Sequence, residues 1–366
     1  MKQPGLVIAP NWVGDAVMCL PALRALVAAQ DHLSWQVAAR PGVAGVFTAA
    51  ARVDGGPGWE VLETDGEPGL RQLWRLRRRL RARPPAMAII FPNSIYSALA
   101  ARASGAKVRI GYARDGRSPL LSTAIAIPRP GATPPHEAFY YLELLRRAGL
   151  IAGLPAEVEP LRAELRPGAA ATALWRERLS AWPPAPGGCR VAIHAGASFG
   201  HAKRWLPERF AAVAAALARD GHAVVFVGSA AEAPLAEALT AQATAPALAP
   251  GTVVSLAGKT DLDGLLAVLS QCRLLIANDS GPMHLAAGVG TRVLAIFGST
   301  NARETHPLAA ARDWRLIQAP GIACSPCKRR ECPIDHRCMT RVQVAEVAAA
   351  ARDLLARPGP GTGTPS

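Results

Sequence analysis

Short apolar runs and longer amphipathic stretches alternate along most of the chain, and this alternation constrains the fold more than any other feature. A short apolar run bounded by turn residues is typical of a buried strand, and apolar residues three or four positions apart are typical of a helix on a sheet. Repeated strand–helix units form parallel sheets covered by helices. The sequence therefore predicts an α/β fold.

The alternation runs through the chain twice. In the first half we expect strands at 6–10, 35–39, 86–91 and 108–111, and a helix at 16–29. In the second half we expect strands at 190–194, 223–228, 253–256, 273–277 and 292–297, with helices between them. Residues 182–188, Trp-Pro-Pro-Ala-Pro-Gly-Gly, can neither continue a helix nor join a sheet. We therefore predict two similar domains, 1–182 and 189–345, and a flexible tail at 357–366, with functional residues directly after strands.

Composition narrows the class of protein. Of the 366 residues 50% are hydrophobic, which excludes wholesale disorder, and the formal net charge is +14. No apolar run approaches the roughly 18 residues that suggest a membrane-spanning helix, so we expect a cytoplasmic protein. The positive charge predicts an acidic partner, either nucleic acid, a phosphorylated sugar or an anionic membrane face.

Two interpretations are open for Asp15, which follows the first predicted strand in the segment Asn-Trp-Val-Gly-Asp at 11–15. It can be a helix N-cap that satisfies free backbone N–H groups. It can instead be a carboxylate at the mouth of a cleft that takes a proton from a hydroxyl group.

Two loops of the second half are suited to phosphate. Ser280 and Gly281 leave backbone N–H groups at the start of a helix, where the partial positive charge favours an anion. Asp279 is expected to orient a sugar hydroxyl or the loop, and His284 lies one turn into the helix. In the other loop, 194–205, small residues allow a ligand to approach and Lys203 can neutralise phosphate; the alternative is an ordinary basic surface loop.

Seven arginines and no acidic residue occupy positions 71–83, with leucines at helical spacing between them. The simplest interpretation is a helix with a solvated charged face. Because so many like charges repel one another, an anionic partner is favoured. One aromatic residue, Trp74, lies in the segment, and no known nucleic-acid module surrounds it.

Four cysteines cluster late in the chain, at 324, 327, 332 and 338. Thiols at such short spacing are compatible with a tetrahedral zinc site, and a cytoplasmic disulfide is disfavoured. A reduced, structural thiol cluster made of Cys324, Cys327, Cys332 and Cys338 is an equal alternative.

Together these segments resemble the ADP-heptose:lipopolysaccharide heptosyltransferases, a resemblance that extends from about residue 6 to residue 355. It rests on an ordered set of motifs: APNWVGDAVMCLPALRAL (9–26), FPNSIYSALAARASG (91–105), RIGYARDGRSPLLS (109–122), HAGASFGHAKRWLPERF (194–210), NDSGPMHLAAGVGTRVLAIFGSTN (278–301) and CSPCKRRECPIDHRCM (324–339).

The resemblance implies the GT-B fold, with two Rossmann-like domains and a last helix, 346–356, that packs back on the first domain. It implies transfer of L-glycero-D-manno-heptose from ADP-heptose to the inner core of lipopolysaccharide, with inversion at the anomeric carbon. Among the family the second-heptose enzymes are most similar, so the acceptor is expected to be heptosyl-Kdo2-lipid A. No cofactor is required, no nucleic-acid partner is expected, and contact with the anionic inner leaflet is expected to be peripheral.

The resemblance also assigns roles to residues. Asp15 is the expected general base, and Lys203 stabilises the departing diphosphate. The expected donor contacts are Ser198, Lys203, Glu232 (ribose), Thr260 (adenine), Asp279, Ser280, Gly281 and His284. The expected acceptor contacts are Asn11, Arg75, Arg78, Arg79, Lys107, Arg109 and Arg114.

Three alternatives remain at this point. Another member of the family, adding the first or third heptose, has the same donor loops. A basic nucleotide-binding protein can keep the fold without catalysis, and such a protein has no need of Asp15. A nucleotide-sugar epimerase has a similar two-domain shape but needs no arginine-rich acceptor surface.

Overall fold

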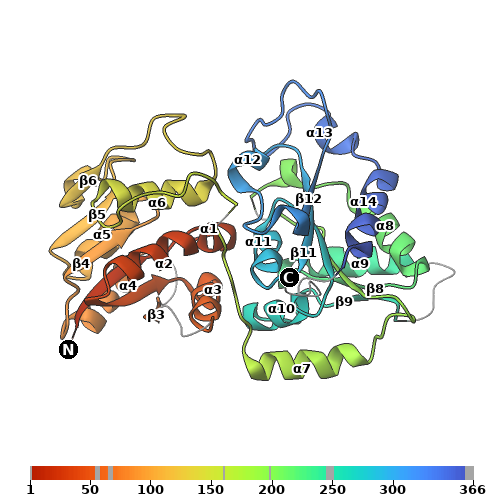
Figure 1. Cartoon of the computed structure of the whole chain (residues 1–366), viewed down its shortest axis with the longest axis horizontal. Coiled ribbons are helices and arrows are strands. Elements are labelled where there is room, and N and C mark those ends of the chain that lie inside the picture. Colours follow the sequence, from red (N-terminus) through yellow and green to blue (C-terminus); the bar gives the residue numbers. More distant parts are fainter. Residues whose placement is uncertain are drawn as a thin grey trace, which may run out of the picture. The chain divides into compact units, whose positions relative to one another are not determined.

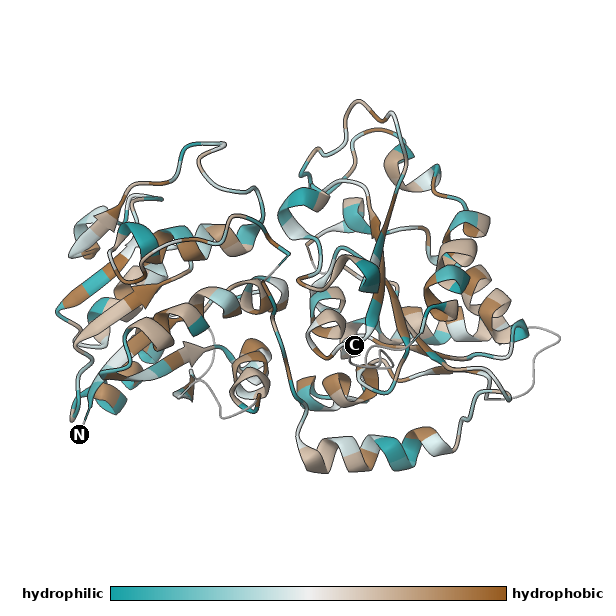
Figure 2. Cartoon of the chain, in the orientation of Figure 1, coloured by the Kyte–Doolittle hydropathy of each residue, from teal (hydrophilic) through white to brown (hydrophobic). Residues whose placement is uncertain are grey.

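The computed structural model describes residues 2–53, 58–64, 69–159, 161–197, 199–244 and 251–358. The chain forms two compact units, Met1–Leu165 and Arg166–Ser366. Each unit contains a six-stranded parallel sheet with helices on both faces, which confirms the predicted α/β class (Figure 1). Figure 2 shows most strand residues in brown, whereas the helices carry many teal and white residues, as expected for strands buried on both faces.

In the first unit the strands are ordered β3-β2-β1-β4-β5-β6. Their bounds are β1 (Gln3–Ile8), β2 (Leu33–Ala39), β3 (Trp59–Glu63), β4 (Met87–Ile90), β5 (Val108–Tyr112) and β6 (Thr123–Ile125). One face carries α1 (Val13–Met18), α2 (Leu20–Ala29), α3 (Pro41–Ala51) and α6 (Glu137–Arg147). The other face carries α4 (Leu70–Leu80) and α5 (Ile95–Ala103).

The second unit repeats this order, with its strands arranged β12-β11-β10-β7-β8-β9. Their bounds are β7 (Arg190–His194), β8 (Ala223–Phe226), β9 (Val253–Ser255), β10 (Leu274–Asn278), β11 (Arg292–Phe297) and β12 (Trp314–Gln318). Helices α8 (Pro207–Arg219), α9 (Ala233–Thr244) and α14 (Val344–Ala356) cover one face, and α7 (Ala169–Ser180), α10 (Leu262–Leu269) and α11 (Gly281–Gly288) the other. Short helices α12 (Ala302–Thr305) and α13 (Arg337–Thr340) lie in the later loops.

The topology fixes where a ligand can bind in each unit. In both sheets the chain reverses its direction of winding between two adjacent strands, β1 and β4 in the first unit and β7 and β10 in the second. In open α/β sheets the crevice for a ligand lies beyond the carboxyl ends of those strands.

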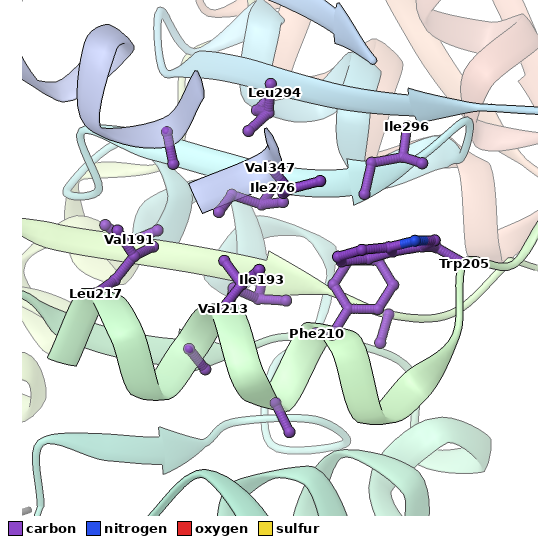
Figure 3. Packing of buried hydrophobic residues seen from close by; sticks show 14 of the residues in the cluster. Val191, Ile193, Trp205, Phe210, Val213, Leu217, Ile276, Leu294, Ile296 and Val347 are labelled. Atoms are coloured by element: carbon purple, nitrogen blue, oxygen red, sulfur yellow. The ribbon is translucent and has the colours of Figure 1, made fainter. Parts of the chain in front are cut away.

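The core of the second unit anchors one of its functional loops (Figure 3). Val191 and Ile193 of β7 pack with Phe210 and other residues of α8, and all are buried. Trp205, at the end of the loop after β7, packs edge-to-face on Phe210 with ring centroids 5.0 Å apart. The indole N–H of Trp205 donates to the Val342 carbonyl at 3.2 Å, so this end of the loop is held by the core.

The predicted helix at 16–29 is wrong in one respect, because the structure has two helices there. α1 ends at Met18 and α2 begins at Leu20, with Cys19 between them. Pro21 lies in the first turn of α2, where its missing N–H is tolerated; inside one continuous helix its ring would clash with a carbonyl of the preceding turn.

The predicted domain boundary at 182–188 also differs from the structure, in which the units divide between Leu165 and Arg166. Helix α7 packs on α10 of the second unit, and its Trp175 is buried. The N–H of Gly168, just before α7, donates to Asp263 Oδ1 at 3.0 Å. These contacts place α7 in the second unit.

The last helix is likewise part of the second unit, whereas we expected it to pack on the first domain. α14 packs on α8 and on strands β10, β11 and β12. Its last turn is held by Arg292, whose guanidinium donates to the carbonyls of Leu354 at 2.9 Å and Arg357 at 3.0 Å. From residue 359 onward the predicted tail lies outside the described residues.

Among the described residues, none of the helices is both long enough and apolar enough to span a lipid bilayer.

Candidate functional site

Two loops meet at the crevice position of the second sheet. One follows β7 and contains residues 195–206, and the other joins β10 to α11. The predicted donor residues Lys203, Asp279 and Ser280 lie in them, and Gly281 begins α11.

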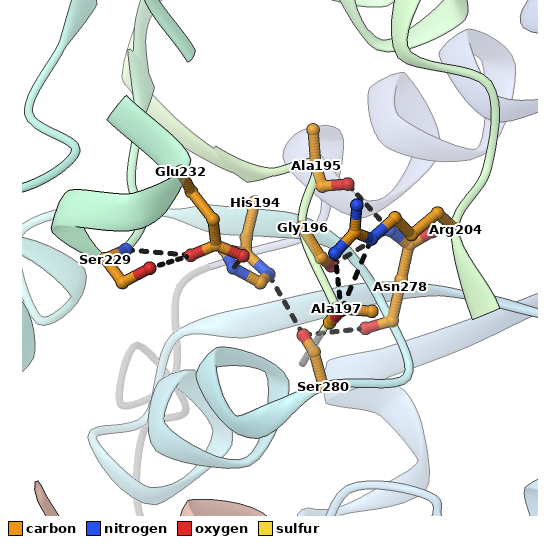
Figure 4. A network of polar contacts seen from close by, with 9 residues as sticks. All are labelled: His194, Ala195, Gly196, Ala197, Arg204, Ser229, Glu232, Asn278 and Ser280. Atoms are coloured by element: carbon orange, nitrogen blue, oxygen red, sulfur yellow. Dashed lines mark hydrogen bonds and ion pairs between the residues drawn. The ribbon is translucent and has the colours of Figure 1, made fainter. Parts of the chain in front are cut away.

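Asn278 joins the two loops and is fully buried. Its side-chain N–H group donates to the carbonyls of Ala195 and Gly196, each at 3.1 Å (Figure 4). Its Oδ1 accepts the backbone N–H of Trp205 at 2.9 Å. One amide therefore holds the beginning and the end of the loop that carries Lys203.

His194 and Glu232 form a second contact at the same edge (Figure 4). His194 Nε2 lies 3.3 Å from Glu232 Oε1, and His194 Nδ1 lies 3.1 Å from Ser280 Oγ. The N–H and the hydroxyl of Ser229 both donate to Glu232 Oε2 at 2.8 Å. The loops after β7, β8 and β10 are thus linked by polar side chains.

These contacts determine the charge of Glu232. Burial by itself would raise the pKa of its carboxyl group, but the bonds from His194 and Ser229 outweigh burial and lower the pKa to about 2. A Cβ atom at position 196 would lie 1.6 Å from Glu232 Oε1, so any larger residue there would displace this carboxylate. Glu232 is therefore an ionised acceptor held close to the backbone of the loop.

Lys203 forms an ion pair with Asp279. Its Nζ lies 2.8 Å from Asp279 Oδ2, and the two side chains are 15% and 5% exposed. The ammonium group also lies 5.0 Å from the centre of the Phe199 ring. Because the pair is largely removed from water, each partner needs the other's charge.

The N-terminus of α11 lies beside this ion pair. Ser280 is its N-cap, no side chain among the described residues caps it, and Pro282 is in its first turn. His284 is buried, and burial lowers its pKa to about 4, so it is neutral near pH 7. Its Nδ1 has no hydrogen-bond partner among the described residues. The helix end therefore combines an N-terminus without a described side-chain cap, a cation and a neutral imidazole.

Thr260 follows β9 and directly precedes Asp261, the N-cap of α10. Thr260 therefore lies at the carboxyl edge of the sheet, as expected, but it is not part of the hydrogen bonds and ion pairs that link the loops after β7, β8 and β10. Ser198 lies outside the described residues.

The first unit has a cavity of ≈ 270 Å³ at its own crevice position. It is lined by the last residues of β1 and β2, by residues that follow β1, β2, β3 and β4, and by α4 and α5: Ile8, Ala9, Asn11, Ala38, Arg40, Thr64, Gln72, Leu73, Leu76, Pro92, Ser94, Tyr96, Ser97 and Ala100. Asn11 was predicted at an acceptor site, whereas Arg40 was not.

Asp15 lies in the first turn of α1 and is not the N-cap, a position that Trp12 occupies. The simple capping interpretation is therefore wrong. Burial and then the charge of Asp15 raise the pKa of Cys19. The same two causes, in the same order, raise the pKa of Tyr141. Both groups near the carboxylate are thus neutral.

The predicted basic acceptor residues are not gathered at the cavity. Arg75, Arg78 and Arg79 are on the exposed face of α4, while the helix lines the cavity with Gln72, Leu73 and Leu76. Lys107 immediately precedes β5, at the strand's amino end.

Arg109 and Arg114 also lie apart from the cavity lining. The guanidinium of Arg109 donates to backbone carbonyls, among them Leu120 at 2.9 Å and Ala106 at 2.8 Å. Arg114 follows β5, and its hydrogen bond is one of the contacts that lower the pKa of Tyr140 against the larger effect of burial. Arg109 is therefore tied to its own loops, whereas Arg114 is at the carboxyl end of its strand.

The four clustered cysteines line one cavity of ≈ 150 Å³, together with His336. All four are free thiols. Burial, and then the neighbouring thiols, raise the pKa of Cys338 to about 11. Among the described side chains, no group of three or more Cys, His, Asp or Glu is arranged to hold a metal ion. The zinc site gains no support from this geometry and stays a prediction.

The cysteine segment supports the loop that carries Lys203. The Ala202 N–H donates to the Arg330 carbonyl at 2.9 Å, and His336 Nε2 lies 3.1 Å from the Ala202 carbonyl oxygen. The segment is thus packed against the candidate site whatever its metal content.

Comparison with known proteins identifies the family. The model of glycosyltransferase family 9 (heptosyltransferase) matches residues 73–337. The chain belongs to this family. The match includes both loops of the second unit, with Lys203 and Asp279.

Individual relatives agree with this result. Lipooligosaccharide heptosyltransferase 2 of Haemophilus influenzae is 31% identical over 325 residues, covering 86% of this chain and 88% of that protein. The solved structure of ADP-heptose lipopolysaccharide heptosyltransferase II of Escherichia coli is 25% identical, with a TM-score of 0.78, and the alignment covers 97% of this chain and 98% of that one.

A third comparison shows the fold alone. An E. coli heptosyltransferase solved with ADP-2-deoxy-2-fluoro heptose is 16% identical, with a TM-score of 0.65 over 96% of this chain and 99% of that one. The fold is therefore of the GT-B type, and the family identifies the protein as a glycosyltransferase.

Sequence reasoning missed Asn278 as a structural clamp, and His194 and Ser229 as partners of Glu232. Asn278 directly precedes the predicted Asp279, so its position after a strand was a usable indication. The pairing of His194 with Glu232 joins residues on different strands, and no local pattern reveals it.

The lowered pKa of Glu232 predicts how the stability of the protein changes with pH. The carboxylate stabilises the fold when ionised, so the wild type should exceed Glu232→Gln in free energy of unfolding by a constant margin above about pH 5. The margin should shrink as the pH falls from 4.5 towards about 2, where the folded state also takes up the proton. Denaturant unfolding over a pH series measures it.

Glu237→Gln, at an exposed position of α9, is the matched control. Its free energy of unfolding should differ little from that of the wild type at any pH. A Glu232 margin that is unchanged down to pH 3, or that grows on acidification, would contradict the assigned contacts.

Proposed function

We propose that the protein transfers L-glycero-D-manno-heptose from ADP-heptose to heptosyl-Kdo2-lipid A, with inversion at the anomeric carbon. The observation that carries the proposal is the Lys203–Asp279 pair beside the N-terminus of α11, at the crevice of the second sheet. This arrangement suits a diphosphate, and the named relatives are heptosyltransferases of the second type.

The diphosphate is held at the start of α11. The backbone N–H groups of Ser280 and Gly281 face the anion, and Lys203 supplies a full positive charge. Negative charge grows on the diphosphate as the bond to the sugar breaks, so donors fixed in advance stabilise the transition state more than the ground state. On this scheme no divalent metal is required.

Asp279 keeps Lys203 in place and then directs the sugar. Its oxygen already accepts from Lys203, so the ammonium group is held beside the helix end before the donor binds. The second carboxylate oxygen is suited to accept from a heptose hydroxyl. The neutral His284, one turn into the helix, adds no charge that would compete with Lys203.

Glu232 binds the ribose in this proposal. An ionised carboxylate accepts strongly from hydroxyl groups, and the lowered pKa keeps Glu232 ionised over the physiological range. We assign Thr260, on the loop after β9, to the adenine. Ser198 remains a proposed donor contact; both assignments rest on the resemblance alone.

The acceptor binds on the first unit. The cavity at the crevice of its sheet offers Asn11 and Arg40 among a mixture of polar and apolar side chains, which suits a sugar with an anionic neighbour. We propose that Arg75, Arg78, Arg79 and Arg114 meet the carboxylates and phosphates of the Kdo-lipid A part. The geometry gives no support for this role to Lys107, at the amino end of β5, or to Arg109, whose guanidinium is bound to backbone carbonyls. Because this acceptor is a membrane lipid, the protein would work in the cytoplasm in peripheral contact with the inner leaflet.

Asp15 is the proposed general base. It would take the proton of the acceptor hydroxyl as that oxygen attacks the anomeric carbon from the face opposite ADP, which gives inversion. It lies in the first turn of α1, directly after the loop that follows β1. The neighbouring Cys19 and Tyr141, both with raised pKa, do not compete with it for the proton.

Asp15→Asn should reduce turnover by at least about 10²- to 10⁴-fold, because the amide cannot accept the proton. Binding of ADP should be nearly unchanged, since Asp15 belongs to the first unit and the proposed donor contacts belong to the second. Steady-state ADP release and calorimetric ADP binding measure the two effects. Asp31→Asn, an exposed site after α2, is the control and should leave both unchanged. Full activity of Asp15→Asn would remove the base assignment.

Lys203→Gln should weaken ADP-heptose binding and lower kcat, because the positive charge that stabilises the transition state is lost. Together the two effects should lower kcat/KM by about 10²- to 10³-fold. It also leaves Asp279 buried without its cation, so stability should fall.

A second variant separates the two effects. Lys203→Gln with Asp279→Asn removes both charges and should recover stability in thermal unfolding without recovering activity. Lys259→Gln, at an exposed position, is the matched control. If the double variant recovered activity along with stability, Lys203 would be structural rather than catalytic.

A further inference from the structure

Helix α4 has two faces of different chemistry. Gln72, Leu76 and Leu80 are buried, and both leucines belong to the core of the first unit. The hydroxyl of Tyr96 on α5 donates to the side chain of Gln72, which ties the inner face in place. The outer face is therefore presented by a helix that is fixed to the core.

Two large apolar side chains lie one turn apart on the outer face. Leu70 is 85% exposed and Trp74 is 60% exposed, the highest values for large hydrophobic residues in the part of the chain that the structure describes. Exposed apolar residues are unremarkable when they are scattered singly, but here they are adjacent on one helix face.

Arginines surround this apolar pair. Arg71, Arg75, Arg77, Arg78 and Arg79 are exposed, and the helix contains no acidic residue. The guanidinium of Arg78 lies 5.5 Å from the centre of the Trp74 ring. Five like charges on one face repel one another. An anionic partner lowers their electrostatic energy, because attraction to the partner offsets this repulsion.

We propose that the outer face of α4, made of Leu70, Trp74 and these five arginines, docks the protein on a bilayer that contains anionic lipids. Nucleic acid would also satisfy the charge, but it has no use for an exposed leucine beside the tryptophan. An interfacial helix has this composition: apolar and aromatic side chains enter the boundary between headgroups and acyl chains, and basic side chains contact the headgroups.

Docking through this face would also serve the proposed transfer reaction. The inner face of α4 contributes Gln72, Leu73 and Leu76 to the cavity of the first unit. A helix that rests on the bilayer keeps that cavity close to a lipid-anchored acceptor. This benefit, unlike the docking itself, rests on the proposed function.

The test uses the full-length protein and vesicles without donor or acceptor. In a flotation assay, wild type should bind vesicles of phosphatidylcholine with phosphatidylglycerol and should not bind vesicles of phosphatidylcholine alone. Leu70→Ser with Trp74→Ser should weaken binding on the order of tenfold or more, because two apolar side chains no longer leave water. Added salt should weaken the binding of wild type.

Leu174→Ser is the matched control, since Leu174 is 43% exposed on α7 of the other unit, and it should bind like wild type. Both sites are exposed, and equal unfolding temperatures would verify that the variants fold. With a deacylated, water-soluble acceptor the double variant should keep wild-type activity, whereas with acceptor in vesicles it should lose activity. This arm separates failure of docking from failure of the transfer reaction.

Absence of wild-type binding to anionic vesicles would overturn the proposal. Equal binding of the wild type and the Leu70→Ser, Trp74→Ser variant to anionic vesicles would also overturn it. The same holds if the wild type bound duplex DNA more tightly than the vesicles. Either result would show that the face acts only through its charge.

Discussion

The loops of the proposed donor site depend on the hydrogen bonds of one buried side chain, that of Asn278. It bonds to both ends of the loop after β7, at Ala195 and Gly196 on one side and at Trp205 on the other. Trp205 is in turn packed in the core on Phe210. The ammonium group of Lys203 is thus positioned by the core of the sheet, and the Lys203–Asp279 pair exists before any ligand arrives. Stabilisation by preorganised charge requires such rigidity.

The repeated strand order explains how one chain can hold two chemically different sites. Each sheet has a crevice where its strand order reverses, and the loops that follow the strands line this crevice. In the second unit those loops supply a cation, a helix N-terminus and an ionised Glu232. In the first unit they form a cavity with Asn11 and Arg40, and Asp15 lies just beyond in α1. The residues at one crevice can therefore change without altering those at the other.

The sequence was sufficient for the fold class, because buried parallel strands are nearly continuous apolar runs. It also indicated the loops after β7 and β10 as candidates for phosphate binding, because they directly follow such runs. It was not sufficient for edge strands such as β3 and β12, whose residues are partly exposed and polar. The break at Pro21 and the place of α7 depend on tertiary packing, and so does the contact of His194 with Glu232. The arginines of α4 were recognised as a charged helix face, but only the structure shows that they point away from the cavity that the helix lines.

The most direct test of the proposed reaction is ADP release from ADP-heptose with two acceptors, Kdo2-lipid A without heptose and Kdo2-lipid A carrying one heptose. The account predicts release only with the mono-heptosylated acceptor. Release with the bare acceptor would contradict the second-heptose assignment and indicate an enzyme that adds the first heptose. No release with either acceptor, from protein that binds ADP, would contradict the proposed transfer itself and leave the fold and the family unchanged.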